Sequence, residues 1–328
     1  MSAHSPKEKF EKLFNNEMEW EEARSFLIEL YEKGETPGEI ATAASIMRAH
    51  SIKLPIPEAL REQAIDVVGT GGDKSGSFNI STTVSLLLAS LGSVVAKHGS
   101  RSITSKSGAA DVLDVLGIHL NLTPQQQVQM LEETGFCFIF AMNHHPVMKH
   151  LMPIRKSIAY RTIFNILGPL TNPAGAKKYL LGVFSPEYIL RIAEALRALE
   201  VTRAYVVSSD DGMDEISLAT TTQFAYVANG VISEGIIDPQ EWGFALAPKE
   251  AILGGDAIDN AKITRAIFAG EATDAQRDIV TLNAGFALYA DGRARDMQES
   301  FEVVRAGLES GMAKVHLEKI AEVSRKLA

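Results

Sequence analysis

The chain has 328 residues, of which 46% are hydrophobic and 22% are charged, an ordinary balance for a folded globular protein. This length allows one large domain with a smaller one beside it. The formal net charge of -9 repels phosphate backbones and so argues against broad nucleic-acid binding.

Two features of the sequence bear on the cellular compartment of the protein. The single cysteine, Cys137, rules out an internal disulfide and favours a reducing, cytoplasmic location. Because Cys137 lies in an apolar run, we expect a buried hydrophobic residue rather than a nucleophile. The polar start does not resemble a signal peptide, and no stretch is apolar over the length of a membrane-spanning helix, so we expect no membrane association.

The first 62 residues predict a small helical unit. Apolar side chains recur at helical spacing over Met18–Lys33. Thr36-Pro37-Gly38-Glu39 then supplies an N-cap, a proline at the first helical position and a glutamate three residues after the cap. We expect residues 1–62 to form a helical domain completed by residues 152–176, where three prolines interrupt the later pattern.

From residue 63 onward, strands alternate with helices. Apolar runs at Ile65–Val68, Phe136–Phe140 and Tyr179–Phe184 indicate strands, and the amphipathic segment Pro186–Leu199 indicates a helix. The predicted fold class is therefore α/β. A large domain of residues 63–328, with a mostly parallel central sheet flanked by helices, accompanies the small all-helical domain.

A glycine-rich loop, Gly69-Thr70-Gly71-Gly72-Asp73, follows the first strand, and Asn79-Ile80-Ser81-Thr82 begins the next helix. Glycines let backbone N–H groups converge on phosphate oxygens, and helix N-termini favour anions. A surface turn would explain the glycines alone, but their coupling to a hydroxyl-rich helix start favours phosphate binding. The loop matches neither the dinucleotide pattern nor the Walker A pattern.

A second loop, Lys97–Asp111, follows the next strand. It combines three cationic side chains with five hydroxyl groups, a mixture that suits a diphosphate or a sugar phosphate. A solvated basic loop capped by Ser107 is the alternative interpretation.

An acidic segment, Ser208–Glu215, follows a later strand. It carries Asp210, Asp211, Asp214 and Glu215, and such oxygen ligands suit Mg²⁺, which often bridges to substrate phosphates. An acidic turn is the alternative, but the position after a strand of the same domain favours a metal site.

The histidine pair His144-His145 precedes Pro146. No further Cys or His lies at ligand spacing, so a pocket wall or ordinary loop histidines are favoured over a zinc site.

At these motifs the chain resembles the anthranilate phosphoribosyltransferase family over essentially its whole length. Beside the two loops and the acidic segment, the resemblance includes His145-Pro146, the specific run Arg161–Pro173 and Leu282-Asn283-Ala284. It implies a homodimer built through the helical domain. It also implies transfer of the phosphoribosyl group of phosphoribosyl pyrophosphate to anthranilate, in tryptophan biosynthesis.

The resemblance implies Mg²⁺ as the cofactor, as two ions. Because the anthranilate amine is already nucleophilic and the departure of pyrophosphate is the difficult step, we expect a dissociative displacement without a covalent intermediate. The resemblance assigns catalysis to Lys97, Asp214 and Glu215, and metal binding to Ser81, Asp214 and Glu215. The residues implied for phosphoribosyl pyrophosphate are Gly69, Thr70, Gly72, Asp73, Ser77, Asn79, Ile80, Ser81, Thr82, Lys97, Gly99, Ser105 and Ala109. Those implied for anthranilate are Gly69, Ser100, His145, Arg155, Gly168 and Pro169.

Two positions depart from the family pattern. Ser100 stands where the family commonly has an asparagine that touches the acceptor, and Ala109 stands where it commonly has a serine. Two rival functions remain: a pyrimidine nucleoside phosphorylase-like enzyme, and a non-catalytic paralogue that binds nucleic acid. The Arg161–Pro173 run and the Asp214-Glu215 pair favour the phosphoribosyltransferase over the phosphorylase. The acidic balance and the intact Asp214-Glu215 pair argue against the nucleic-acid-binding paralogue.

Overall fold

The computed structural model describes residues 5–73, 75–102 and 106–328. A seven-stranded sheet in the order β3-β2-β1-β4-β5-β6-β7 forms its centre. The strands are β1 (Ala64–Gly69), β2 (Val94–Gly99), β3 (Phe136–Phe140), β4 (Lys178–Gly182), β5 (Arg203–Ser209), β6 (Thr222–Ala228) and β7 (Val231–Ile237). The first five strands are parallel, and β6 and β7 continue the sheet as an antiparallel hairpin.

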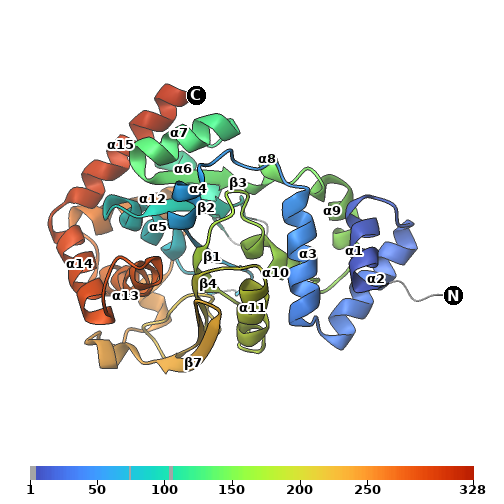
Figure 1. The fold of residues 1–328 in the computed structure, drawn as a ribbon. Coiled ribbons are helices and arrows are strands. Elements are labelled where there is room, and N and C mark those ends of the chain that lie inside the picture. The colour runs from blue at the N-terminus through green and yellow to red at the C-terminus, as the bar shows by residue number, and fades with distance from the viewer. Residues whose placement is uncertain (1–4, 74, 103–105) are drawn as a thin grey trace.

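Helices cover both faces of this sheet (Figure 1). In the described part of the chain the α-helices are α1 (Pro6–Phe14), α2 (Trp20–Lys33), α3 (Pro37–Ala49), α4 (Glu58–Gln63), α5 (Ile80–Ser90), α6 (Ala109–Val115), α7 (Pro124–Thr134), α8 (Ala141–His144), α9 (Met148–Lys156), α10 (Phe164–Leu170), α11 (Glu187–Ala198), α12 (Ala257–Ala269), α13 (Asp274–Asp291), α14 (Met297–Glu309) and α15 (Met312–Leu327). Two short 3₁₀ helices, η1 (Pro239–Trp242) and η2 (Lys249–Ile252), precede α12. The predicted fold class is confirmed.

The strand order creates a topological switch point between β1 and β4. From β1 the chain moves through α5 to β2 and β3 on one side, and later returns to place β4 on the other side. In open α/β sheets, ligands bind in the crevice outside the carboxyl ends of strands at such a point. Gly69 ends β1 and Gly182 ends β4, so the glycine loop and the acidic segment after β5 belong to this edge.

Side chains alternate between two hydrophobic clusters along each strand, as the pleat requires. Val95, Phe136 and Leu180 face the cluster formed with α5 and α12–α15, whereas Ala96, Cys137 and Leu181 face the cluster formed with α1–α3 and α9–α11. Cys137 is fully buried, and burial raises the pKa of its thiol, which confirms the prediction of a hydrophobic role.

The helices of the first 50 residues pack beside α9 and α10, at the end of the molecule opposite α13–α15 (Figure 1). Arg48 Nε donates to the carbonyl oxygen of Leu170 at 2.6 Å, and the Phe14 and Phe164 rings meet edge-on at 6.1 Å. As predicted, Thr36 caps α3 in a capping box with Glu39. These contacts support the proposed helical domain of residues 1–62 completed by residues 152–176.

None of the helices in the described part of the chain has the length and apolar character that crossing a membrane requires.

Substituting Gly182 tests whether the sheet edge tolerates a side chain. A Cβ at Gly182 would lie 1.5 Å from the backbone oxygen of Asp214, so one of the two segments must shift. We expect Gly182→Ala to lower the free energy of unfolding by about 3 kcal/mol, measured by chemical denaturation. Gly38→Ala is the control, because its Cβ meets no atom within 4 Å, and it should change stability by less than about 1 kcal/mol. Equal effects of the two substitutions would contradict the close contact.

Candidate active site

Two glycines at the carboxyl ends of neighbouring strands admit the side chain of Asp214. A Cβ on Gly69 would lie 2.3 Å from Asp214 Oδ2, and the corresponding contact at Gly182 involves the Asp214 backbone. Asp214 Oδ2 accepts a hydrogen bond from the Gly71 N–H at 2.6 Å. The acidic segment is therefore anchored on the glycine loop, residues 69–73, by contacts that only glycine permits.

Asp73, Asp214 and Glu215 form a cluster whose ligand atoms all lie within 4.8 Å of one another. Burial, and then the charge of Asp73, raise the pKa of Asp214 to about 7. Burial, followed by the charges of Asp214 and Asp73, raises the pKa of Glu215 well above its usual range. Oxygen atoms of Asp73 and Glu215 are buried without a hydrogen-bond partner among the described residues. Crowded carboxylates of this kind fit a divalent cation, which would relieve their mutual repulsion.

The other two carboxylates of the acidic segment stabilise its turn. Asp211 accepts hydrogen bonds from the Ser209 hydroxyl at 2.5 Å and from the Met213 N–H at 3.2 Å. Asp210 Oδ1 accepts from the Gln223 side chain at 2.7 Å. The sequence pattern of four acids therefore divides into two that shape the turn and two that join the cluster.

Lys97 lies on β2 and is almost completely buried. Its Nζ donates to the carbonyl oxygen of Val67 at 2.6 Å and lies 3.5 Å from Ser81 Oγ. Burial lowers the pKa of Lys97 to about 8, opposed by the charges of Asp66 and Glu215. Because this pKa lies above neutrality, the ammonium group keeps its charge near pH 7.

Asp66 holds the strands behind this lysine together. Its carboxylate accepts from the His98 N–H at 3.3 Å and from Asn172 Nδ2 at 2.8 Å, and Asn172 also donates to the Ala96 carbonyl. Burial raises the pKa of Asp66 to about 7, opposed chiefly by the charge of Lys97.

The start of α5 lies beside the carboxylate cluster. Ser81, Asp214 and Glu215 line one small cavity of about 10 Å³ together with Gly182. Ile80 and Thr82 are fully buried. The Ile80 N–H donates to the Phe78 carbonyl at 2.7 Å, whereas the Thr82 hydroxyl has no hydrogen-bond partner among the described residues. Asn79 is engaged elsewhere: its side chain donates to the Ser107 carbonyl and accepts from Asn260.

The remaining predicted phosphate ligands lie in neighbouring loops. Ser77 follows the glycine loop and its hydroxyl lies 3.1 Å from the Ser75 hydroxyl. A Cβ on Gly99 would lie 3.3 Å from the Cβ of Ala109, so β2 and the start of α6 meet at these residues. The Ser100 carbonyl accepts a hydrogen bond from the Ala110 N–H in α6. Ser105 lies outside the described residues.

On the other face of β2, His98 and His145 form a buried pair linked to Gly168. His98 Nδ1 lies 3.1 Å from the Gly168 carbonyl oxygen, and His98 Nε2 lies 3.2 Å from His145 Nε2. A carbonyl only accepts, so His98 Nδ1 carries the proton and His98 Nε2 accepts from His145 Nε2–H. This assignment leaves a lone pair on His145 Nδ1, which is buried without a hydrogen-bond partner among the described residues.

Both histidines are held in the neutral form. Burial, then the proximity of His145, lowers the pKa of His98 well below its usual range. Burial, then His144, lowers the pKa of His145 to about 4. His144 itself is used structurally, since its Nδ1 lies 2.6 Å from the Ile52 carbonyl oxygen.

Arg155 on α9 is the predicted partner of a carboxylate. Its side chain is partly buried, and burial lowers the pKa of its guanidinium. Within the residues that the structure describes, the Arg155 guanidinium has no hydrogen bond or ion pair, and its backbone carbonyl accepts from the Ile158 N–H at 3.2 Å. Pro169 follows Gly168 inside α10 and is buried.

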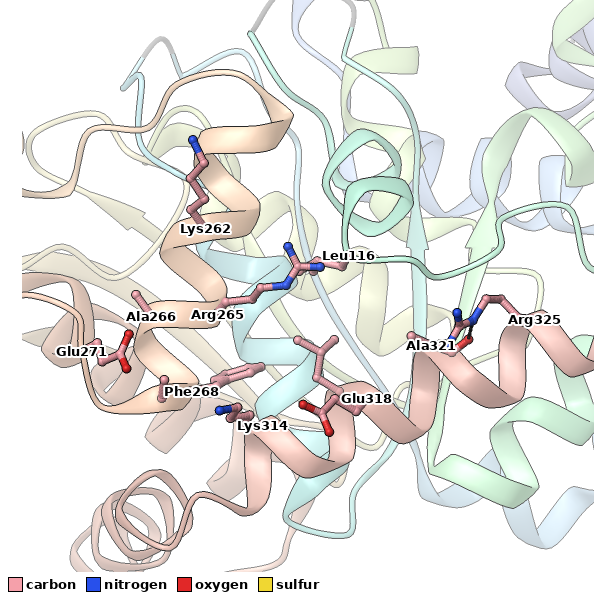
Figure 2. A pocket seen from close by; sticks show the side chains of 12 residues that line it. Leu116, Lys262, Arg265, Ala266, Phe268, Glu271, Lys314, Glu318, Ala321 and Arg325 are labelled. Atoms are coloured by element: carbon pink, nitrogen blue, oxygen red, sulfur yellow. Dashed lines mark hydrogen bonds between the residues drawn. The ribbon is translucent and has the colours of Figure 1, made fainter.

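A larger cavity, of about 480 Å³, lies away from these groups, between α12 and α15 (Figure 2). It shares none of its lining residues with the carboxylate cluster or the histidine pair. Its charges are mixed, and Figure 2 shows Lys262 and Arg325 at opposite ends. Cavity volume therefore does not locate the active site in this chain.

Sequence reasoning missed three contributions to the site. Asp73 was assigned to substrate alone, yet it joins the carboxylate cluster. His98 and Asp66 received no role, although each makes buried hydrogen bonds at the site. For Asp66 and His98, the available signal was a polar side chain inside a short apolar strand, because burying such a group is costly unless it is paired.

The fold and the site define a transferase of the glycosyl transferase class. A family model described as "Glycosyl transferase family, a/b domain" matches residues 61–314. An anthranilate phosphoribosyltransferase from Xanthobacter autotrophicus is 44% identical, over 97% of this chain and 91% of that protein. The chain therefore belongs to the anthranilate phosphoribosyltransferase family.

Solved structures agree with this assignment. The anthranilate phosphoribosyltransferase of Thermus thermophilus superposes with a TM-score of 0.92 at 38% identity, covering 99% of this chain and 97% of that chain. The Saccharomyces cerevisiae enzyme, in complex with phosphoribosyl pyrophosphate and Mg, has a TM-score of 0.88 at 24% identity, covering 98% of this chain and 94% of that chain. At that identity the yeast protein supports the shared fold.

The hydrogen-bond chain through the two histidines predicts their tautomers. We expect ¹⁵N NMR to show His98 as the Nδ1–H form and His145 as the Nε2–H form at neutral pH. Because the pKa of His145 is lowered to about 4, its ring should stay neutral well below pH 6.5, where an unfolded histidine titrates. Spectra of His98→Gln and His145→Gln would assign the signals. An Nδ1–H tautomer at His145 would contradict the chain of donors.

Proposed function

We propose that this chain transfers the phosphoribosyl group of phosphoribosyl pyrophosphate to the amine of anthranilate, giving phosphoribosylanthranilate and pyrophosphate in tryptophan biosynthesis. The observation that carries the proposal is the cluster of Asp73, Asp214 and Glu215 against the glycine loop and beside buried Lys97. This arrangement has the groups that a magnesium–diphosphate needs, in a chain of the family named for this reaction.

Mg²⁺ is the proposed cofactor, as two ions. Asp214, Glu215 and Ser81 would hold the metal, joined by Asp73, whose unpaired oxygen lies in the same cluster. When bound, Mg²⁺ supplies positive charge that stabilises the departing pyrophosphate. The yeast relative was crystallised with phosphoribosyl pyrophosphate and Mg, which supports the same pair of ligands here.

The proposed diphosphate site combines backbone donors with one fixed cation. The loop glycines and the first residues of α5 supply N–H groups, and Lys97 supplies positive charge. Ile80 and Ala109 would contribute through the backbone, because neither has a polar side chain, and Thr82 would also offer its buried, unpartnered hydroxyl. The full proposed set is Gly69, Thr70, Gly72, Asp73, Ser77, Asn79, Ile80, Ser81, Thr82, Lys97, Gly99, Ser105 and Ala109.

The proposed acceptor site lies on the other face of β2. Gly69, Ser100, His145, Arg155, Gly168 and Pro169 form the set, with the Arg155 guanidinium pairing with the anthranilate carboxylate. The uncommitted guanidinium of Arg155 supports this role, because a partly buried cation without a partner gains most from an anionic ligand.

Catalysis then depends on the leaving group and on alignment. The anthranilate amine is neutral and nucleophilic, so no strong base is required before attack. The bond from the ribose carbon to pyrophosphate breaks while the bond to the amine forms, without a covalent enzyme intermediate. Charged Lys97 stabilises the developing negative charge, and holding both substrates in line supplies the rest of the acceleration.

The assembly is proposed to be a cytoplasmic homodimer that pairs through the helical domain. The exposed aromatic residues Trp20, Tyr31 and Tyr160 support this surface, and the Tyr31 and Tyr160 rings stack at 4.3 Å. A partner that covers them would remove apolar area from water. Light scattering of the purified chain measures its oligomeric state directly.

The reaction is tested by incubating the protein with anthranilate, phosphoribosyl pyrophosphate and Mg²⁺ and following the loss of anthranilate fluorescence. We expect turnover that depends on all three components. Asp214→Asn combined with Glu215→Gln should lower kcat/KM about 100-fold or more, because charge stabilisation of the leaving group is lost. Release of a free base from a pyrimidine nucleoside and phosphate, in place of this turnover, would favour the phosphorylase alternative.

Metal binding is tested without activity. Burial, and then repulsion between the carboxylates, raise the pKa values of Asp214 and Glu215, so their charged forms cost stability as the pH rises above the pKa of the unfolded chain. The same double variant should therefore be more stable than wild type in EDTA near pH 8. Mg²⁺ at about 100 times its dissociation constant should stabilise wild type by about 2.7 kcal/mol and leave the variant unchanged. The exposed pair Glu234→Gln with Glu241→Gln is the control and should keep the Mg²⁺ response. Equal Mg²⁺ effects on Tm in all three proteins would exclude this metal site.

A further inference from the structure

The glycine loop is tied to the sheet edge at three points. The Thr70 N–H donates to the Gly182 carbonyl at 2.9 Å, and the Phe184 N–H donates to the Thr70 hydroxyl at 3.1 Å. The Gly71 N–H donates to Asp214. All three contacts involve the first half of the loop, before Gly72.

The second half is held by Arg161. Its Nη2 donates to the Gly72 carbonyl oxygen at 2.7 Å. The same guanidinium lies over the Phe184 ring, 3.6 Å from the ring centroid. Arginine suits this place because its flat cation stacks on an aromatic face while its edge donates a hydrogen bond. Its orientation is thus set by two independent contacts.

Without this contact, the loop backbone at Gly72 has little to restrain it. Gly71 and Gly72 are both exposed and adopt positive φ angles of 67° and 76°. Glycine has the widest conformational freedom of any residue, so ordering this pair costs more entropy than ordering other residues. The next residue, Asp73, must nevertheless stay within the carboxylate cluster.

We propose that Arg161 is a positioning residue for phosphoribosyl pyrophosphate: by holding the Gly72 carbonyl, it fixes the second half of the glycine loop and keeps Asp73 at the metal site. This inference rests on the proposed function. Arg161 lies in the segment between α9, which carries the proposed acceptor residue Arg155, and α10, which carries Gly168. The Arg161 side chain therefore links the α9–α10 region, which carries the proposed acceptor residues, to the glycine loop of the proposed diphosphate site.

The test compares Arg161→Gln, Arg161→Lys and wild type in steady-state kinetics. Arg161→Gln should raise KM for phosphoribosyl pyrophosphate about tenfold, equivalent to about 1.4 kcal/mol of lost binding, while kcat changes less than about threefold. Arg161→Lys should recover part of this loss, because an ammonium group can still donate to the Gly72 carbonyl. Arg305→Gln is the matched control, since Arg305 lies over the Phe244 and Phe301 rings away from the site, and it should leave KM unchanged.

Calorimetric binding of phosphoribosyl pyrophosphate with Mg²⁺, without acceptor, separates this inference from the proposed reaction. A chain that binds this ligand but ignores anthranilate would contradict the proposed acceptor, whereas a tenfold weaker affinity in Arg161→Gln would still support Arg161. Phe184→Leu, which removes only the ring face, should weaken binding by a smaller factor. Unchanged affinity and KM in Arg161→Gln would overturn the proposal, as would a loss in kcat alone or a Lys variant no better than Gln.

Discussion

The site depends on one steric constraint: the acidic segment approaches the ends of β1 and β4 so closely that neither Gly69 nor Gly182 can carry a side chain. These glycines lie where the strand order reverses, which is where α/β sheets bind ligands. Packing at two backbone positions thus fixes Asp214, and Asp214 in turn fixes Gly71 by a hydrogen bond. The first half of the glycine loop is therefore joined to the acidic segment by direct contacts.

The alternation of side chains along β2 separates the two halves of the proposed reaction. Lys97 points to the α5 face, where it meets Val67 and Ser81, whereas His98 points to the opposite face and meets Gly168. In the proposed reaction, Lys97 would serve the leaving group on one face, and His98 would orient His145 of the acceptor set on the other. Asp66 joins the two functions, because it accepts the His98 backbone N–H and its charge counteracts the lowering of the Lys97 pKa by burial.

Much of this architecture could be predicted from sequence, because short apolar runs and capping residues are local signals. The strand at Phe136–Phe140 and the capped helix after Thr36 have the predicted positions. The antiparallel hairpin of β6 and β7 was not predicted; most of β7 is exposed, so its sequence carries a weak pattern. The joining of Asp73 to Asp214 was also missed, since only tertiary packing brings the glycine loop and the acidic segment together.

The electrostatics of the cluster also bear on how the substrate enters. Three carboxylates lie close to one ammonium group, and burial followed by their mutual repulsion raises the pKa values of Asp214 and Glu215. A bare diphosphate would add negative charge to a site that is already short of positive charge. A divalent cation reverses this balance, since it attracts both the protein carboxylates and the substrate oxygens. In the proposed reaction, the metal is therefore required for binding as well as for departure of the pyrophosphate.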